Sequence, residues 1–238
     1  MLTFESMEKI AIASGKGGVG KTSITFMLAS YLKNKGHKVG LLDADIYGPN
    51  LTELLPVTED QIKVKHDPID KKLVPIKSSG LLINSISYVL DQDKAAIWRG
   101  PVLSKAIKQL YLNTRWGNLD YLLIDMPPGT GDAYLTILND LDIKKALLVA
   151  VDDTFCISDL KRTQSLMKKF NVESLGIVEN MSENVDSSGN IEESVRIKDE
   201  LKDNILFSLP RIKRNEFYQE VKQLDKLKKY FPNNLLQK

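Results

Sequence analysis

A glycine-rich octet near the amino end constrains the fold of this chain more than any other stretch. Its residues are Gly15, Lys16, Gly17, Gly18, Val19, Gly20, Lys21 and Thr22, and Ser23 follows them. The octet fits the pattern G-x-x-x-x-G-K-[ST], with an apolar run at 10–13 before it and a helical pattern at 21–35 after it. A strand, a glycine turn and a helix start in this order are typical of a loop that binds a nucleoside triphosphate.

Each residue type in the octet has a defined use in such a loop. Glycines let successive backbone N–H groups converge on phosphate oxygens without interference from a Cβ atom. Lys21 is expected to reach the β- and γ-phosphates, and the Thr22 hydroxyl is expected to ligate Mg²⁺. Lys16 is a second lysine early in the loop, and by itself it is either an additional cation at the phosphates or an ordinary solvated side chain.

Three carboxylates follow predicted buried strands. The apolar run 39–42 leads into Asp43 and Asp45, and the hydrophobic run 119–125 ends in Asp125. Because ligands bind at the carboxyl ends of parallel strands, these side chains are predicted to face the phosphates. Asp125 is expected near the Mg²⁺ hydration shell, since Mg²⁺ needs only one or two protein oxygens. An aspartate after a strand can also be a helix cap or a turn former, but three motifs in the expected order favour a nucleotide site.

Longer motifs extend this pattern along the chain. They read D-A-D-I-Y-G-P-N at 43–50, R-G-P at 99–101, D-M-P-P-G-T-G-D at 125–132 and V-E-N-M-S at 178–182. Together with S-G-K-G-G-V-G-K-T they resemble the Mrp/ApbC iron–sulfur carrier ATPases of the MinD/ParA superfamily, over residues from about 8 to 182. MinD and ParA proteins share the deviant loop with its early lysine, but they lack the Y-G-P-N extension.

The resemblance implies a role for each matching residue. The family's early lysine, here Lys16, reaches across a homodimer to the nucleotide of the partner subunit. Asp45 would orient the attacking water, and Asp43 would support Mg²⁺ and Lys16. Asn180 would hydrogen-bond the adenine edge, and residues around Pro210 would pack against the base. The implied activity is slow hydrolysis of ATP to ADP and phosphate, with Mg²⁺, in a homodimer that forms on ATP binding.

These assignments define the expected site. The predicted catalytic residues are Lys16, Lys21 and Asp45, and the predicted metal ligands are Thr22, Asp43 and Asp125.

The chain departs from the family pattern after the V-E-N-M-S motif. Family members carry a C-x-x-C pair there that bridges a cluster between two subunits, whereas residues 183–190 contain no cysteine. Cys156 is the only cysteine of the chain, and iron–sulfur clusters usually take four cysteine ligands. Cys156 follows a predicted strand at 146–151 and is expected to be a small buried side chain. We therefore predict no bridging iron–sulfur cluster at the place that the family uses.

The remaining pattern predicts an α/β fold with a single doubly wound, mostly parallel sheet flanked by helices. The chain has 238 residues, of which 42% are hydrophobic, and we expect residues 1–238 to form one P-loop ATPase domain. A hairpin is predicted from 62–65 and 73–76, a strand at 81–86 and a helix at 101–112. The regulatory amino-terminal domain common in the family is expected to be missing, because the phosphate loop begins almost at once.

Bulk properties favour a cytoplasmic protein. No signal peptide is expected in 1–8, no run approaches ~20 apolar residues, and one cysteine suits a reducing compartment. The net charge of +2 gives no general attraction to nucleic acid, so no nucleic-acid partner is expected.

The carboxyl-terminal segment 211–238 is basic and has apolar residues at near-helical spacing, among them Leu227, Tyr230 and Phe231. A basic amphipathic helix could rest on anionic lipid, as the tail of MinD does, or could close the domain with a solvated charged face. We expect the closing helix, because Pro232 leaves only a short segment for membrane contact.

Two functions therefore remain open at this stage. The first is an ATPase of iron–sulfur cluster assembly or transfer, with scaffold or client proteins as partners and without its own bridging cluster. The second is a positioning or regulatory switch of the MinD/ParA kind. A metabolic kinase would need an acceptor site that the sequence does not show. The Y-G-P-N, R-G-P and V-E-N-M-S motifs favour the first function.

Overall fold

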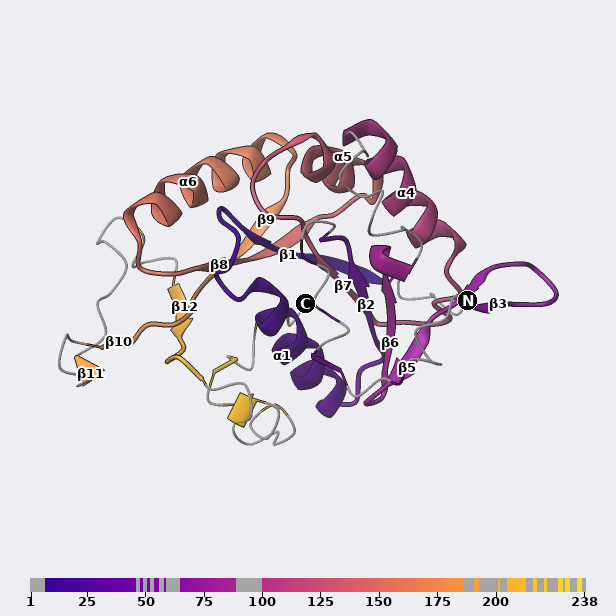
Figure 1. Cartoon of the computed structure of the whole chain (residues 1–238), viewed down its shortest axis with the longest axis horizontal. Coiled ribbons are helices and arrows are strands. Elements are labelled where there is room, and N and C mark those ends of the chain that lie inside the picture. Colours follow the sequence, from indigo (N-terminus) through magenta and orange to yellow (C-terminus); the bar gives the residue numbers. More distant parts are fainter. Residues whose placement is uncertain are drawn as a thin grey trace, which may run out of the picture.

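The fold is given by a computed structural model that describes most of the chain (Figure 1). The described residues are 7–45, 48, 51, 54–55, 58, 65–88, 100–185, 191–192, 201, 205–212, 216–217, 221, 227–228, 230–231 and 235–236.

One eight-stranded sheet forms the centre of the molecule. In spatial order its strands are β12 (Ile205–Ser208), β9 (Glu173–Glu179), β8 (Lys145–Ala150), β1 (Glu8–Ser14), β7 (Tyr121–Asp125), β2 (Val39–Asp43), β6 (Leu81–Ser85) and β5 (Ile76–Ser78). Every neighbouring pair is parallel except β5 and β6, which are antiparallel. The predicted mostly parallel sheet is confirmed.

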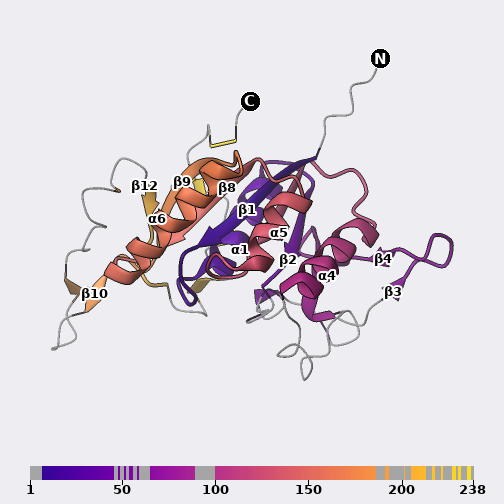
Figure 2. The same ribbon diagram turned by 90° about the horizontal axis from the view of Figure 1, so that it is seen from above.

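Helices cover both faces of this sheet (Figure 1). Helix α1 (Lys21–Asn34) lies on one face, and α4 (Gly100–Asn113), α5 (Asp132–Asp140) and α6 (Thr154–Lys169) lie on the other. Figure 2 shows these three helices side by side over the sheet. Because both faces are covered, the central strands carry continuous apolar runs, and residues 10–13 of β1 are fully buried.

Near the site, the helices and strands lie at the residues where the sequence predicts them. Helix α1 begins at the predicted residue, directly after Gly20, whose backbone φ of 86° is left-handed. The predicted strand at 81–86 is β6, followed by a short 3₁₀ helix η2 (Ile86–Tyr88), and the predicted helix at 101–112 is α4. Each of these predictions is confirmed.

Two short ribbons complete the described elements. Strands β3 (Lys65–His66) and β4 (Leu73–Val74) pair antiparallel and form part of the predicted hairpin, whose residues 62–64 lie outside the described residues. Strands β10 (Asn184–Val185) and β11 (Ile191–Glu192) also pair antiparallel. The sequence missed this ribbon, because each strand has only two residues, which is too short for an alternating apolar pattern.

The described apolar residues of the carboxyl-terminal segment belong to the core. Leu227 and Phe231 are fully buried, and the ring of Phe231 lies 5.0 Å from the rings of both Tyr31 in α1 and Phe207 in β12. This packing favours a closing segment over a lipid-facing helix. Among the described residues, no helix combines the length and apolarity that crossing a membrane requires.

Candidate nucleotide-binding site

The site begins at the carboxyl edge of three adjacent strands. Strand β7 lies between β1 and β2, and Asp125 at its end is in register with Asp43 at the end of β2. Strand β1 ends at Ser14, directly before the glycine-rich loop. The parallel sheet therefore brings together three motifs that are far apart in the sequence, at the edge where parallel sheets bind ligands.

The loop borders a cavity of about 590 Å³. Its lining residues are Ser14, Lys16, Gly17, Gly18, Gly20, Lys21, Thr22, Ser23, Asp45, Gly48, Leu54, Pro128, Ile212 and Phe217. A Cβ atom at Gly15 would lie 2.6 Å from the backbone of Asp159 in α6, and one at Gly20 would clash with the Asn180 side chain. Both glycines are thus required by close approaches, and Gly20 is required by its left-handed backbone as well.

The inner end of the cavity is a buried network around Asp125. Lys21 Nζ lies 2.8 Å from Asp125 Oδ1 and 3.3 Å from Asp45 Oδ2. The hydroxyl groups of Thr22 and Thr25 donate hydrogen bonds to Asp125 at 2.7 and 3.0 Å. Burial opposes the charge on Lys21, but Asp125 and Asp45 outweigh it and raise the pKa of Lys21. Lys21 is therefore a permanent cation at the inner end of the cavity.

Asp43 and Asp45 differ in their surroundings. Asp43 is fully buried and accepts hydrogen bonds from Ser85 Oγ at 3.0 Å and from the backbone N–H of Asp45 at 3.1 Å. Burial, and then the Asp125 carboxylate, raise the pKa of Asp43. Asp45 lines the cavity, and burial raises its pKa although Lys21 opposes the shift. Asp45 is the carboxylate placed to meet a group in the cavity.

The donor set at this end fits a hydrated Mg²⁺ ion. Asp43, Asp45 and Asp125 bring three carboxylates to one lysine, and an additional cation would relieve their mutual repulsion. Thr22 Oγ1 and the Asp125 carboxylate are hard oxygen ligands in direct contact. Among the described residues there is no cluster of three or more His, Cys, Asp or Glu side chains that could by itself hold a metal.

The outer rim of the cavity carries the second lysine of the loop. Lys16 Nζ lies 3.5 Å from Asp153 Oδ1, and the two side chains are 49% and 39% exposed. Asp153 is also the N-cap of α6, where its side chain accepts a hydrogen bond from the backbone N–H of Cys156 at 2.9 Å. The sequence did not single out Asp153; its position before an apolar periodic run is an N-cap signal, which says nothing about a lysine elsewhere. That Lys16 reaches a partner's nucleotide remains a prediction.

The opposite side of the cavity is built from residues late in the chain. Asn180 Nδ2 donates a hydrogen bond to the carbonyl oxygen of Val19 at 2.8 Å, so it lies directly against the phosphate loop. Ile212 and Phe217 line the cavity, and Pro210 is partly buried two residues before Ile212. The sequence placed the base-packing residues around Pro210 but missed Ile212 and Phe217. Asn180 and Pro210 as base contacts remain predictions.

Several motif residues lie outside the described residues. These are Ile46, Tyr47, Pro49, Asn50 and Arg99. Gly48 and Pro128, from two of the same motifs, line the cavity.

The cysteine of the chain is fully buried in the first turn of α6. Burial raises the pKa of the Cys156 thiol, which disfavours the thiolate that a metal cluster needs. The prediction of a buried Cys156 is confirmed.

Comparison with known proteins decides the family. The family model of the ParA type described as "NUBPL iron-transfer P-loop NTPase" matches residues 5–205. The chain belongs to this family. Its resemblance to the Mrp/ApbC carriers, drawn from the motifs, is thereby confirmed.

Curated relatives of this chain carry the name "Iron-sulfur cluster carrier protein". The relative from Haemophilus influenzae is 44% identical over 173 residues, which cover 73% of this chain and 46% of that protein. The relative from Salmonella typhimurium is 45% identical over 179 residues, covering 75% and 48%. The chain thus spans about half the length of the curated relatives it matches.

Solved structures support the same fold. A nucleotide-binding protein from Archaeoglobus fulgidus, in complex with ADP, is 29% identical with a TM-score of 0.71, over 95% of this chain and 89% of that one. The septum site-determining protein MinD from Pyrococcus horikoshii, complexed with Mg-ADP, is 22% identical with a TM-score of 0.62, over 96% and 90%. The MinD similarity concerns the fold alone.

Proposed function

We propose that this NTPase binds MgATP and hydrolyses it slowly to ADP and phosphate, in a cytoplasmic homodimer that forms on ATP binding. The observation that carries the proposal is the Lys21–Asp125–Thr22 network at the inner end of a loop-lined cavity. A buried cation, a hydroxyl and strand-end carboxylates are the groups that phosphate and Mg²⁺ require.

The residues of the site would bind different parts of the nucleotide and its Mg²⁺ ion. Backbone N–H groups of 15–22 would hold the phosphates, and Lys21 would exchange its contacts with Asp125 and Asp45 for the β- and γ-phosphate oxygens. Thr22, Asp43 and Asp125 would hold Mg²⁺, which supplies positive charge to the phosphate oxygens when it is bound. Asn180 and the apolar pair Ile212 and Phe217, with Pro210 beside them, would contact the base.

Hydrolysis requires a positioned water and compensation of the charge that develops on the phosphate. Asp45 borders the cavity 3.3 Å from Lys21 Nζ and would orient the water. Lys21 would compensate the charge from its own subunit, and Lys16 would do so from the partner subunit.

We further propose a role in iron–sulfur cluster assembly or transfer, in which the cluster is cargo. The curated relatives bear the carrier name, but this chain has no cysteine at 183–190 and its Cys156 is buried. The cluster would then be held by a cysteine-bearing scaffold or client, and ATP would govern contact with that partner.

Anaerobic reconstitution with iron and sulfide tests this assignment. We expect ATP hydrolysis and ATP-driven dimerisation without a stable cluster, measured by iron counting and visible absorbance. The matched control is Cys156→Ser, which should behave as the wild type. A yield of about four irons per dimer that is lost in Cys156→Ser would overturn the proposal, since it would make Cys156 a cluster ligand.

An ATP-dependent positioning or regulatory switch of the MinD/ParA kind is the second candidate. The observation that favours it is the burial of Cys156, because no accessible thiol is left to handle a cluster. Cluster transfer between two cysteine-bearing proteins separates the candidates. If MgATP and this protein accelerate the transfer, the first function holds; an ATP-driven dimer without any effect on transfer supports the switch.

A further inference from the structure

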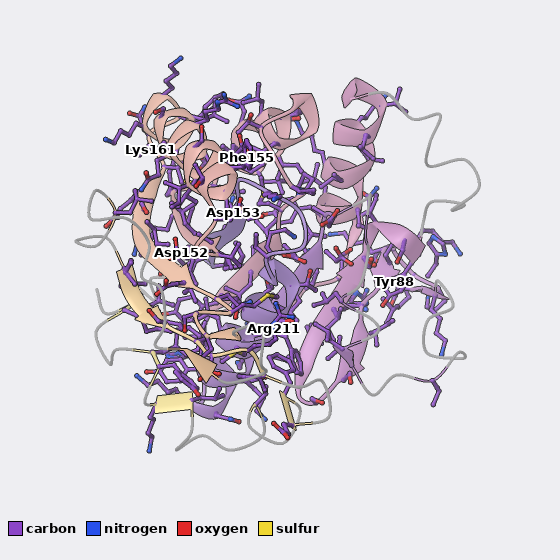
Figure 3. The ribbon with its side chains drawn as sticks, turned by 60° about the vertical axis from the view of Figure 1, so that its left-hand side comes forward. Tyr88, Asp152, Asp153, Phe155, Lys161 and Arg211 are labelled. Carbon is purple, nitrogen blue, oxygen red and sulfur yellow. The ribbon has the colours of Figure 1, made fainter. Side chains whose placement is uncertain are left out.

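The first turn of α6 exposes a large aromatic side chain at the carboxyl edge of the sheet. Phe155 is 73% exposed, whereas Cys156, Ile157 and Leu160 of the same helix are buried. Figure 3 shows Phe155 at the start of α6, next to Asp153 and Asp152. The apolar periodicity of α6 is satisfied without Phe155, so the core does not explain this residue.

Phe155 is fixed relative to the phosphate loop. The backbone of Asp159 in α6 lies so close to Gly15 that no side chain fits between them. Asp153, two residues before Phe155, contacts Lys16 at 3.5 Å. The start of α6 and the rim of the nucleotide cavity therefore form one surface.

A second exposed apolar residue lies at the same edge. Helix α4 leads back from the carboxyl end of β6 to the start of β7, so its first turn is at the carboxyl edge and its last turn is at the opposite edge. Val102, in the first turn of α4, is 54% exposed. The first turns of α4 and α6 thus both present apolar side chains on the side where the nucleotide cavity opens.

The charges of this surface allow it to meet a copy of itself. Lys16 and Asp153 form an ion pair on the rim, so this lysine and this carboxylate neutralise each other. In a two-fold dimer the same patch meets itself, and a patch of one sign would be repelled by its copy. An exposed aromatic residue beside a neutralised charge pair fits the pattern of an apolar centre with a polar rim.

We propose that the first turn of α6 docks on a second copy of this chain, with Phe155 as the apolar anchor of the contact. The inference rests on the proposed ATP-dependent homodimer and names a residue that holds it together. The triphosphate of the partner subunit would compete with Asp153 for Lys16. Phe155 would become buried in the contact between the two subunits. Aromatic residues at the centre of interfaces supply a large share of binding energy.

The test compares Phe155→Ser with Ile69→Ser in the full chain. Ile69 is 86% exposed in the turn of the β3–β4 hairpin, which is bridged through Leu73 to Thr114 after the last turn of α4, and so it lies away from the carboxyl edge. Sedimentation velocity with MgATP, over a series of protein concentrations, gives the dimer Kd. We expect Phe155→Ser to raise this Kd at least about tenfold and Ile69→Ser to change it less than about twofold. Phe155→Leu should retain most of the affinity, because it remains apolar.

Calorimetry with ATP at low protein concentration completes the experiment. We expect the monomers of all variants to bind ATP as the wild type does, because Phe155 does not line the cavity. A wild type that dimerises with ATP, together with a Phe155→Ser variant that dimerises equally well, overturns the docking surface but leaves the proposed function intact. A wild type that stays monomeric with ATP overturns the proposed homodimer and this surface with it. Loss of ATP affinity in Phe155→Ser would also overturn the proposal, since the residue would then act on the loop.

Discussion

The two lysines of the phosphate loop lie in contrasting parts of the same cavity. Lys21, at the inner end, is buried and contacts two carboxylates, at 2.8 and 3.3 Å. Lys16, on the rim, is half exposed and contacts Asp153 at 3.5 Å. The loop thus presents one cation to a closed network and one to an open surface.

The difference in burial determines how readily each lysine can exchange its ion-pair partner. Removing one partner of a buried charge pair leaves an uncompensated charge in a region of low dielectric and is strongly unfavourable. Exposed ion pairs are screened by water and contribute little, so they exchange partners readily. The inner end is therefore suited to bind phosphate and metal tightly, since they replace the charge partners of a buried lysine, and the rim is suited to change its contacts at little cost when ATP or a partner arrives.

The largest expected effect comes from breaking the inner end. Lys21→Ala removes the buried cation at the β- and γ-phosphates and should cost several kcal/mol of ATP binding, about 10³-fold in Kd. Isothermal titration calorimetry with MgATP measures the loss. Lys16→Ala is the matched control in the same loop and should keep the ATP affinity of the monomer. An unchanged affinity in Lys21→Ala would refute the phosphate site.

A smaller effect is expected from changing Asp45, the residue proposed to orient the reacting water. Asp45→Ala should lower the hydrolysis rate about 10²-fold or more, because a positioned acid–base group typically contributes that much, while the ATP-bound dimer still forms. Phosphate release in a single turnover measures the step. Because Asp45 also contacts Lys21, Asp45→Asn serves as a variant of equal size. Wild-type rates in both variants would remove Asp45 from the mechanism.

The rim is tested by the second lysine. Lys16→Ala should lower ATP-dependent dimerisation and turnover together, by about tenfold, since the loss of one charge at an interface is of this order. Light scattering with and without ATP follows the dimer, and a coupled assay follows hydrolysis. If the variant dimerises and hydrolyses ATP as the wild type does, Lys16 is an ordinary solvated lysine.

The inner end of the site could be predicted from the sequence, because each of its parts is encoded locally. The glycine pattern defines the loop, and an apolar run followed by aspartate marks a strand end. Once the strands are parallel, their carboxyl ends meet, so Lys21 and Asp125 come together although 104 positions separate them. The contact also depends on the strand order, because β7 lies directly beside β1, which leads into the loop.

The rim, and the side of the cavity that Ile212 and Phe217 line, could not be predicted in the same way. Asp153 carries only the local signal of a helix cap, and its contact with Lys16 depends on how α6 packs against the loop. Phe217 lines the cavity while its ring lies 6.4 Å from that of Phe26, a pairing that no local pattern encodes. The basic carboxyl-terminal segment shows the same limit, since apolar spacing is identical for a helix on lipid and for a segment packed on a core.

The smallest expected effect concerns the ion pair between Asp153 and Lys16 on the rim. Asp153→Asn removes the charge that attracts Lys16, and asparagine keeps a side-chain oxygen that can cap α6 as well as aspartate does. Lys16 would then be available to a triphosphate without first leaving a carboxylate. Half-maximal dimerisation should therefore occur at an ATP concentration lower by no more than a few-fold, as expected for an exposed pair, and the difference should fade at high salt.

A titration of the dimer with ATP at two salt concentrations measures this shift. Asp159→Asn is the matched control, because it removes a carboxylate from the same helix whose partner is Arg162 rather than Lys16. A higher ATP requirement in Asp153→Asn would mean that Asp153 acts in the assembled dimer and not before it. The contact between Lys16 and Asp153 would then persist in the dimer, and the rim would not exchange its ion-pair partners when ATP arrives.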